Sequence, residues 1–139
     1  MKPETKFSHS LKPHLPGDTT RIETGSTECG VPDISGTWVG NDYWVENKVY
    51  GNKAKIRDVT TLLRPEQKVW PLARAKQGAT IYVCVKYPFG IALYRCFPPI
   101  EGEPITVAHY ELWAVIDSCK KVGDQIKWFL ATGHKRRTE

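Results

Sequence analysis

The sequence lacks paired cysteines, clustered histidines and any long apolar run. Its four cysteines are scattered without a CxxC pair, whereas structural zinc sites need ligands at short spacings. The four histidines show no spacing typical of a metal site or a catalytic pair. No apolar run is long enough to span a bilayer, and MKPETK at the N-terminus is unlike a signal peptide. We therefore expect a cytoplasmic protein with reduced thiols and no membrane partner.

What the sequence does contain is enough chain for one hydrophobic core and a surplus of positive charge. It has 139 residues, of which 40% are hydrophobic and 25% charged, as in soluble globular domains. The formal net charge is +5, and basic residues gather in residues 52–57, 68–76 and 134–137. Such patches attract phosphate backbones without reading sequence, so an anionic partner is favoured.

The two ends of the chain are expected to lie outside the main domain. Residues 1–20 contain three prolines and few large apolar side chains, which predicts an N-terminal arm or a short helix. Residues 133–139 are expected to form a basic C-terminal tail. The main domain then spans residues 21–132.

A hairpin and a helix are the clearest local patterns. Residues 33–39 and 43–50 are strand-like and flank Gly40-Asn41-Asp42, which has the chemistry of a hairpin turn. Proline and glycine at the two ends of residues 64–78 predict a helix between them. Pro71 is expected to kink or split that helix.

The second half of the chain predicts more sheet. Residues 79–87 and 91–97 are apolar and strand-like, around a Pro-Phe-Gly turn. Residues 105–123 begin with β-branched residues, but their later half has helical spacing. Residues 125–132 fit either a last strand or a helical turn. A central sheet with a helix between its strands indicates an α/β or α+β domain. The helical spacing in residues 105–123 rests on Leu112, Val115, Ile116 and Cys119.

Three charged side chains of the hairpin suggest hydrolytic chemistry. Asp33 opens one strand and Glu46 lies on the next, so the hairpin can bring their carboxylates together. Lys48 is two residues from Glu46 and shares its face of the strand. Two carboxylates and the carbonyl of Asn47 would suit Mg²⁺, or Mn²⁺ in its place, which completes its shell with water and phosphate oxygens. Lys48 would then orient or deprotonate water and neutralise developing charge. The alternative is a surface ion pair.

GVPD at residues 30–33 and WVENK at residues 44–48 resemble the PD-(D/E)XK nuclease signature. Asp33 takes the place of the motif aspartate, and residues 46–48 take the place of E-x-K. The similarity extends over roughly residues 20–97 and is to the small phage-type, VRR-NUC-like branch. The resemblance implies a restriction-endonuclease-like core, with a central mixed β-sheet flanked by helices, and a place in the host cytoplasm if the protein is phage-encoded.

The resemblance also points to further site residues. Many relatives carry a glutamate on a helix before the motif, and FSHSLKPHL has none. Glu23 is the nearest substitute, unless it is a loop carboxylate that caps backbone amides. Gln67, on the predicted helix, either bonds Lys48 or the scissile phosphate or has no role. Loop hydroxyls and the basic tail would contact phosphate, although turn chemistry explains the hydroxyls equally well. These nucleic-acid-binding candidates are Thr24, Ser26, Lys135, Arg136 and Arg137.

The five tryptophans are many for this length. Core packing explains most of them, since aromatic side chains dominate small cores. Stacking on a splayed base is the alternative, with Tyr43 and Trp38 near the hairpin turn as the first candidates.

The expected function is that of a Mg²⁺-dependent endonuclease acting on branched DNA such as Holliday junctions. A C₂ homodimer would supply the two symmetric active sites that junction resolution needs. The alternative is a non-catalytic nucleic-acid-binding protein on a nuclease-like fold, and the intact set of Asp33, Glu46 and Lys48 favours the enzyme. An avidin-like barrel, suggested by GTWVGNDYW, is disfavoured by the predicted helix.

Overall fold

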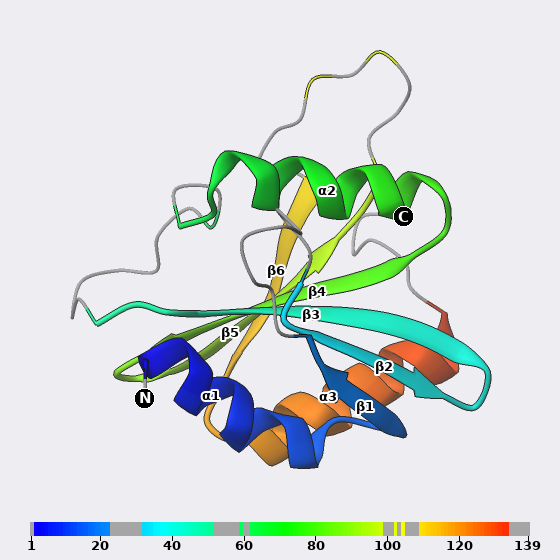
Figure 1. Cartoon of the computed structure of the whole chain (residues 1–139). Helices are drawn as coiled ribbons and strands as arrows, with labels where there is room; N and C mark the ends of the chain where they lie inside the picture. The colour runs from blue at the N-terminus through cyan, green and yellow to red at the C-terminus, as the bar shows by residue number, and fades with distance from the viewer. Residues whose placement is uncertain are drawn as a thin grey trace.

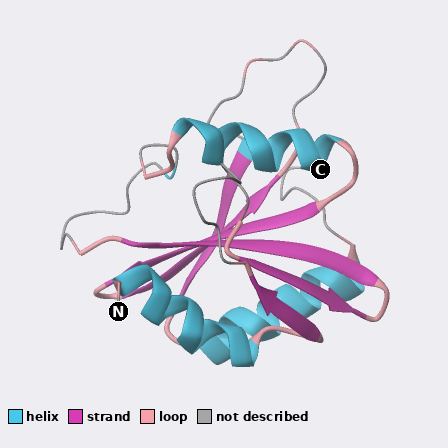
Figure 2. Ribbon diagram, in the orientation of Figure 1, coloured by secondary structure: helices cyan, strands magenta, loops and turns pink. Residues whose placement is uncertain are grey.

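A central sheet lies between two layers of helices. The computed structural model of the chain describes residues 2–22, 32–51, 59, 62–98, 102, 104 and 109–133. In this part of the chain, helix α2 covers one face of a six-stranded sheet, and helices α1 and α3 cover the other (Figure 1, Figure 2). The predicted mixed α/β (α+β) architecture, with helices flanking a central mixed sheet, is confirmed.

The strands follow chain order across the sheet, from β1 at one edge to β6 at the other. Neighbouring strands are antiparallel except β3 and β4, which are parallel and are connected through α2. The strands are β1 (Asp18–Arg21), β2 (Ile34–Trp38), β3 (Asn41–Val49), β4 (Thr80–Tyr87), β5 (Gly90–Cys96) and β6 (Tyr110–Ile116). The helices are α1 (Pro3–Leu11), the 3₁₀ helix η1 (Lys12–His14), α2 (Pro65–Lys76) and α3 (Cys119–Thr132).

The hairpin forms as predicted, but its turn begins one residue before the predicted Gly40. Trp38 pairs with Asn41, so the connection is the two-residue turn Val39-Gly40. Both of these residues have positive φ, 49° and 78°, which is the twist that suits two-residue hairpins. Val39 is β-branched and disfavours this conformation on its own. The pairing of the strands, rather than the local preference of Val39, therefore sets the turn.

The predicted helix at residues 64–78 is confirmed as α2. Of the predicted kink or split at Pro71, the split is wrong, because the helix continues through this residue. Pro65 occupies the first turn, and Gly78 follows the end of the helix with a φ of 98°. Pro71 lies inside the helix and cannot donate a hydrogen bond to the preceding turn. Its side chain is buried, and this burial against the sheet offsets the missing bond.

The later half of residues 105–123 differs in part from the prediction. Leu112, Val115 and Ile116 belong to strand β6, not to a helix, whereas Cys119 begins helix α3. A register shift beside Leu93 interrupts the pairing of β6 with β5, and such a bulge hides the alternation that normally marks a strand. Helix α3 follows and includes all of residues 125–132. Its start is capped by the Ser118 hydroxyl, which accepts a hydrogen bond from the backbone of the first turn.

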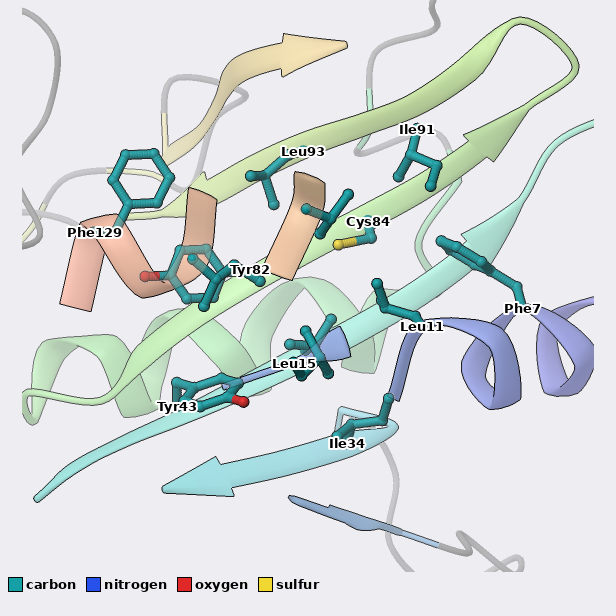
Figure 3. Close-up of a cluster of buried hydrophobic side chains, with 13 residues drawn as sticks. Phe7, Leu11, Leu15, Ile34, Tyr43, Tyr82, Cys84, Ile91, Leu93 and Phe129 are labelled. Atoms are coloured by element: carbon teal, nitrogen blue, oxygen red, sulfur yellow. The ribbon is translucent and has the colours of Figure 1, made fainter. Parts of the chain in front are cut away.

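Helix α1, in the predicted N-terminal arm or short helix, packs against the sheet. Phe7 and Leu11 point from α1 onto the sheet and are 2% and 0% exposed (Figure 3). They join a cluster that includes Cys84, which is buried as predicted. Within the described residues the cysteines are free thiols, and burial raises the pKa of Cys84 and Cys96. No helix in the described ranges is both long and apolar enough to cross a membrane.

Candidate active site

The structure brings the carboxylates of Asp33 and Glu46 together, as the hairpin spacing predicts. The register pairs Ile34 with Val45, so Asp33 and Glu46 follow as the next opposing positions. Their side chains share a hydrogen bond. Glu46 is 3% exposed, and Asp33 is half-buried. The pair therefore lies at the start of β2, mostly withdrawn from water.

Pro32 explains why the pair can form a site at this point of the sheet. Continuing the register by one more step sets Pro32 opposite Asn47, and proline has no N–H to donate to the facing carbonyl. The N–H of Asn47 donates instead to Oδ2 of Asp33, at 2.8 Å. Since both backbone polar groups of a strand residue face the same edge, the Asn47 carbonyl also faces the β2 edge of β3. Its role as a third oxygen ligand stays a prediction.

The environment of Glu46 keeps this carboxyl protonated to an unusually high pH. Burial raises the pKa of Glu46 well above 4.5, and the charge and hydrogen bond of Asp33 raise it further. The charge of Lys48 lowers the pKa and that of Glu4 raises it. A bound cation would offset the negative charge of this carboxylate pair. Their oxygens, with the Asn47 carbonyl, match the hard ligands that Mg²⁺ prefers.

Lys48 lies on the Glu46 side of the sheet, as predicted. Alternate residues of β3 face opposite layers: Trp44 packs in the cluster beneath α2, whereas Asn47 donates a hydrogen bond from Nδ2 to Ser8 of α1 at 2.9 Å. Glu46 and Lys48 therefore share the α2 side with Trp44. Lys48 is half-buried, and its charge acts on Glu46.

Glu4 is the residue that the sequence interpretation missed. The resemblance predicts a glutamate on a helix before the motif, and residues 7–15 contain none. Helix α1, however, begins at Pro3 and has Glu4 in its first turn. Its charge is among those that raise the pKa of Glu46. A proline followed by an acidic residue is a signal for a helix start, and it was available in the sequence.

Gln67 has a different hydrogen-bond partner from the one expected. Its side chain is 5% exposed, and its Oε1 accepts a hydrogen bond from the backbone N–H of Arg64 at 3.0 Å. This bond satisfies one of the donors at the start of α2. The amide oxygen therefore stabilises the helix, which leaves the Nε2 group as the donor that Gln67 can offer to a phosphate.

The other predictions for site residues have separate outcomes. Tyr43 is fully buried and donates from its hydroxyl to the carbonyl of Pro16 at 2.6 Å, so it is not open to a base. Trp38 is half-buried, with the ammonium of Lys127 5.3 Å from its ring centroid.

No group of three or more His, Cys, Asp or Glu side chains in the described residues is close enough to hold a metal. The candidates outside the described residues are Glu23, Thr24, Ser26, Lys135, Arg136 and Arg137.

Replacing Glu46 with glutamine is expected to stabilise the protein at neutral pH without added metal. Because the folded-state pKa of Glu46 lies above 4.5, folding favours the protonated form. The free energy of unfolding of the wild type therefore falls as pH rises from 4.5 towards the folded-state pKa, by at most about 1.4 kcal/mol per pH unit. Glutamine does not ionise and removes this fall. Urea unfolding in EDTA between pH 5 and 8 measures it, with Asp18→Asn as the control at an exposed carboxylate. Identical pH slopes for wild type and Glu46→Gln would contradict the raised pKa.

Comparison with known proteins adds no family assignment. The chain matches no protein-family model, and a search of curated proteins finds no match. The functional interpretation therefore depends on the geometry around Asp33, Glu46 and Lys48.

Proposed function

We propose that the protein is a Mg²⁺-dependent endonuclease that hydrolyses phosphodiester bonds in branched DNA such as four-way junctions. The observation that carries this proposal is the hydrogen-bonded carboxylate pair of Asp33 and Glu46, with Lys48 on the same side of the sheet. In a purely structural ion pair, the only charged neighbour of Glu46 would be a basic side chain. Here burial and a second acid both oppose its charge, and such a cost is typical of functional sites.

Each group has a role in this proposal. Asp33, Glu46 and the Asn47 carbonyl would hold Mg²⁺, or Mn²⁺ in its place, which when bound polarises a phosphate oxygen and a water molecule. Lys48 orients the attacking water and offsets the negative charge that develops on phosphorus oxygens. The charge of the exposed Glu4 on α1 also acts on Glu46, as the smallest of the named influences on its pKa, and adds to the negative potential at the pair.

The order of elements supports a nuclease-like core. The strand, turn, strand, helix, strand order implied by the resemblance corresponds to β2, the Val39-Gly40 turn, β3, α2 and β4. The motif aspartate precedes β2 and the E-x-K residues lie on β3. The net charge of +5 is in keeping with a DNA partner. The homodimer stays a prediction, and sedimentation of the full chain measures it.

Substitution of Asp33 tests the metal site. Asp33→Asn is expected to weaken Mn²⁺ binding at least about ten-fold, because a ligating carboxylate is lost, and to lower cleavage of a labelled four-way junction in parallel. Calorimetry measures the affinity, and single-turnover assays with and without Mg²⁺ measure cleavage. Asp18→Asn, an exposed carboxylate on β1, is the matched control and should change neither. Undiminished Mn²⁺ binding by Asp33→Asn would contradict the proposal that Asp33 is a metal ligand. DNA binding without any cleavage would favour the non-catalytic alternative.

A further inference from the structure

A second feature of the α2 side of the sheet is a groove between the β2–β3 turn and the end of α2. Its volume is about 630 Å³. In Figure 1 the turn and the end of α2 lie at the same end of the sheet. The groove begins beside Trp44, which shares its strand face with Glu46. The lining residues on which the proposal depends are Gly40, Asp42, Trp44, Trp70, Arg74 and Gly78.

The floor of the groove is aromatic and partly open. The ring centroids of Trp44 and Trp70 are 5.5 Å apart at an interplanar angle of 73°, and both rings are half-buried. The guanidinium carbon of Arg74 lies 5.1 Å from the Trp70 centroid. Arg74 is exposed. A guanidinium over an indole presents a flat surface on which another planar ring can stack.

The charges around the groove favour a neutral ring over a phosphate. The carboxylate of Asp42 lines it and is held by the Thr37 hydroxyl, which donates at 2.7 Å. The last turn of α2 also lines it, and the C-terminal end of a helix is the negative end of its dipole. Both groups repel a phosphate, whereas Asp42 can accept hydrogen bonds from the N–H groups of a base.

Two glycines keep the rim of the groove open. A Cβ atom built on Gly40 or on Gly78 would meet no atom within 4 Å. No neighbouring atom therefore crowds the rim at these two positions, one on the hairpin side and one on the helix side of the groove. An uncharged planar ligand with polar edges fits such a site better than a compact anion does.

We propose that this groove binds one unpaired nucleobase of the DNA strand being cut, stacked on Arg74 and Trp70. The proposal rests on the proposed endonuclease function. Trp44 and Glu46 are two residues apart on one strand face, which is about 6.5 Å along the strand. Trp70 and Arg74 lie further from Glu46, with Trp70 5.5 Å from Trp44 and Arg74 5.1 Å from Trp70, so the bound base belongs to a nucleotide within a few positions of the cleaved phosphate. Intact duplex does not offer such a base, whereas the single-stranded arm of a fork or flap does, so the groove would favour branched DNA with unpaired bases beside the cut.

Oligonucleotides that lack single bases test the groove. The substrates are fluorescent forked DNAs, each with one abasic site at a successive position around the cleaved bond, and binding is measured in Ca²⁺. For wild type, one or two abasic positions should weaken binding about ten-fold, the size of one base–aromatic stack. Arg74→Ala should lose about ten-fold on intact DNA but lose nothing further on those abasic substrates. Trp70→Phe, which keeps a ring, should lose less than Arg74→Ala does.

The matched control is Lys76→Ala, which removes the same charge from the exposed surface of the same helix turn. It should weaken binding to every substrate equally. If Arg74→Ala also behaves in this way, Arg74 is a phosphate contact and the base-binding groove is overturned. Cleavage of the same DNAs by wild type in Mg²⁺ reports separately on the proposed function. If cleavage occurs but no abasic position weakens binding, only the base-binding role of the groove is contradicted. If wild type neither binds nor cleaves these DNAs, both proposals are contradicted.

Discussion

Replacing Lys48 with alanine is expected to lower single-turnover cleavage of a four-way junction at least about 100-fold, the loss typical for one catalytic group acting in the transition state. Lys48 is half-buried on the side of β3 that presents Glu46, and its charge acts on that carboxylate. The fold and most of the DNA affinity should remain. Lys48→Arg should not restore the rate, because a guanidinium is larger and does not release its proton.

Lys86 provides the control for this experiment. It lies on β4 opposite Val49, and its ammonium is 6.0 Å from the ring centroid of Phe7, on the α1 side of the sheet. Lys86→Ala therefore removes the same charge one strand away and on the other face, and it should cleave at close to the wild-type rate. Binding is followed in Ca²⁺ so that affinity and rate are separated. A wild-type rate for Lys48→Ala would mean that the hairpin charges are structural.

Replacing Glu111 with alanine is expected to lower the free energy of unfolding by about 3 kcal/mol, because it leaves a buried guanidinium without its carboxylate. Arg95 is 2% exposed and forms an ion pair with Glu111. Its guanidinium carbon lies 4.4 Å and 4.7 Å from the ring centroids of Trp113 and Phe129. These rings shield the guanidinium from water, so water cannot replace the lost partner. Urea unfolding measures the change.

Two further variants separate the buried charge from the loss of side-chain packing. Asp117→Ala breaks an exposed pair with Lys121, in which both side chains are more than 60% exposed, and should cost less than about 1 kcal/mol. The double variant Arg95→Met with Glu111→Leu removes both charges and should be more stable than Glu111→Ala alone. A cost for Glu111→Ala as small as that for Asp117→Ala would show that Arg95 does not depend on this carboxylate.

The sequence by itself determined the elements whose signals are local. Glycine and proline mark the ends of α2 and the turns between strands, and apolar runs mark β4 and β5. Because β3 has a period of two, the spacing alone set Glu46 and Lys48 on one face. The short hairpin loop then brought Asp33 opposite Glu46. The central part of the candidate site could be predicted for this reason: it lies within one hairpin, where few conformations are open to the chain.

Only the tertiary structure decided the features that depend on contacts between distant segments. Pairing with β5 made β6 a strand despite its helical spacing, and packing on the sheet kept α2 continuous through Pro71. The Oε1 atom of the buried Gln67 accepts a hydrogen bond from the Arg64 N–H at the start of its own helix. Residues 3–11 brought Glu4 towards Glu46, 42 positions away in the chain. Spacing along a sequence reports neighbours in the chain, whereas burial and electrostatics depend on neighbours in space.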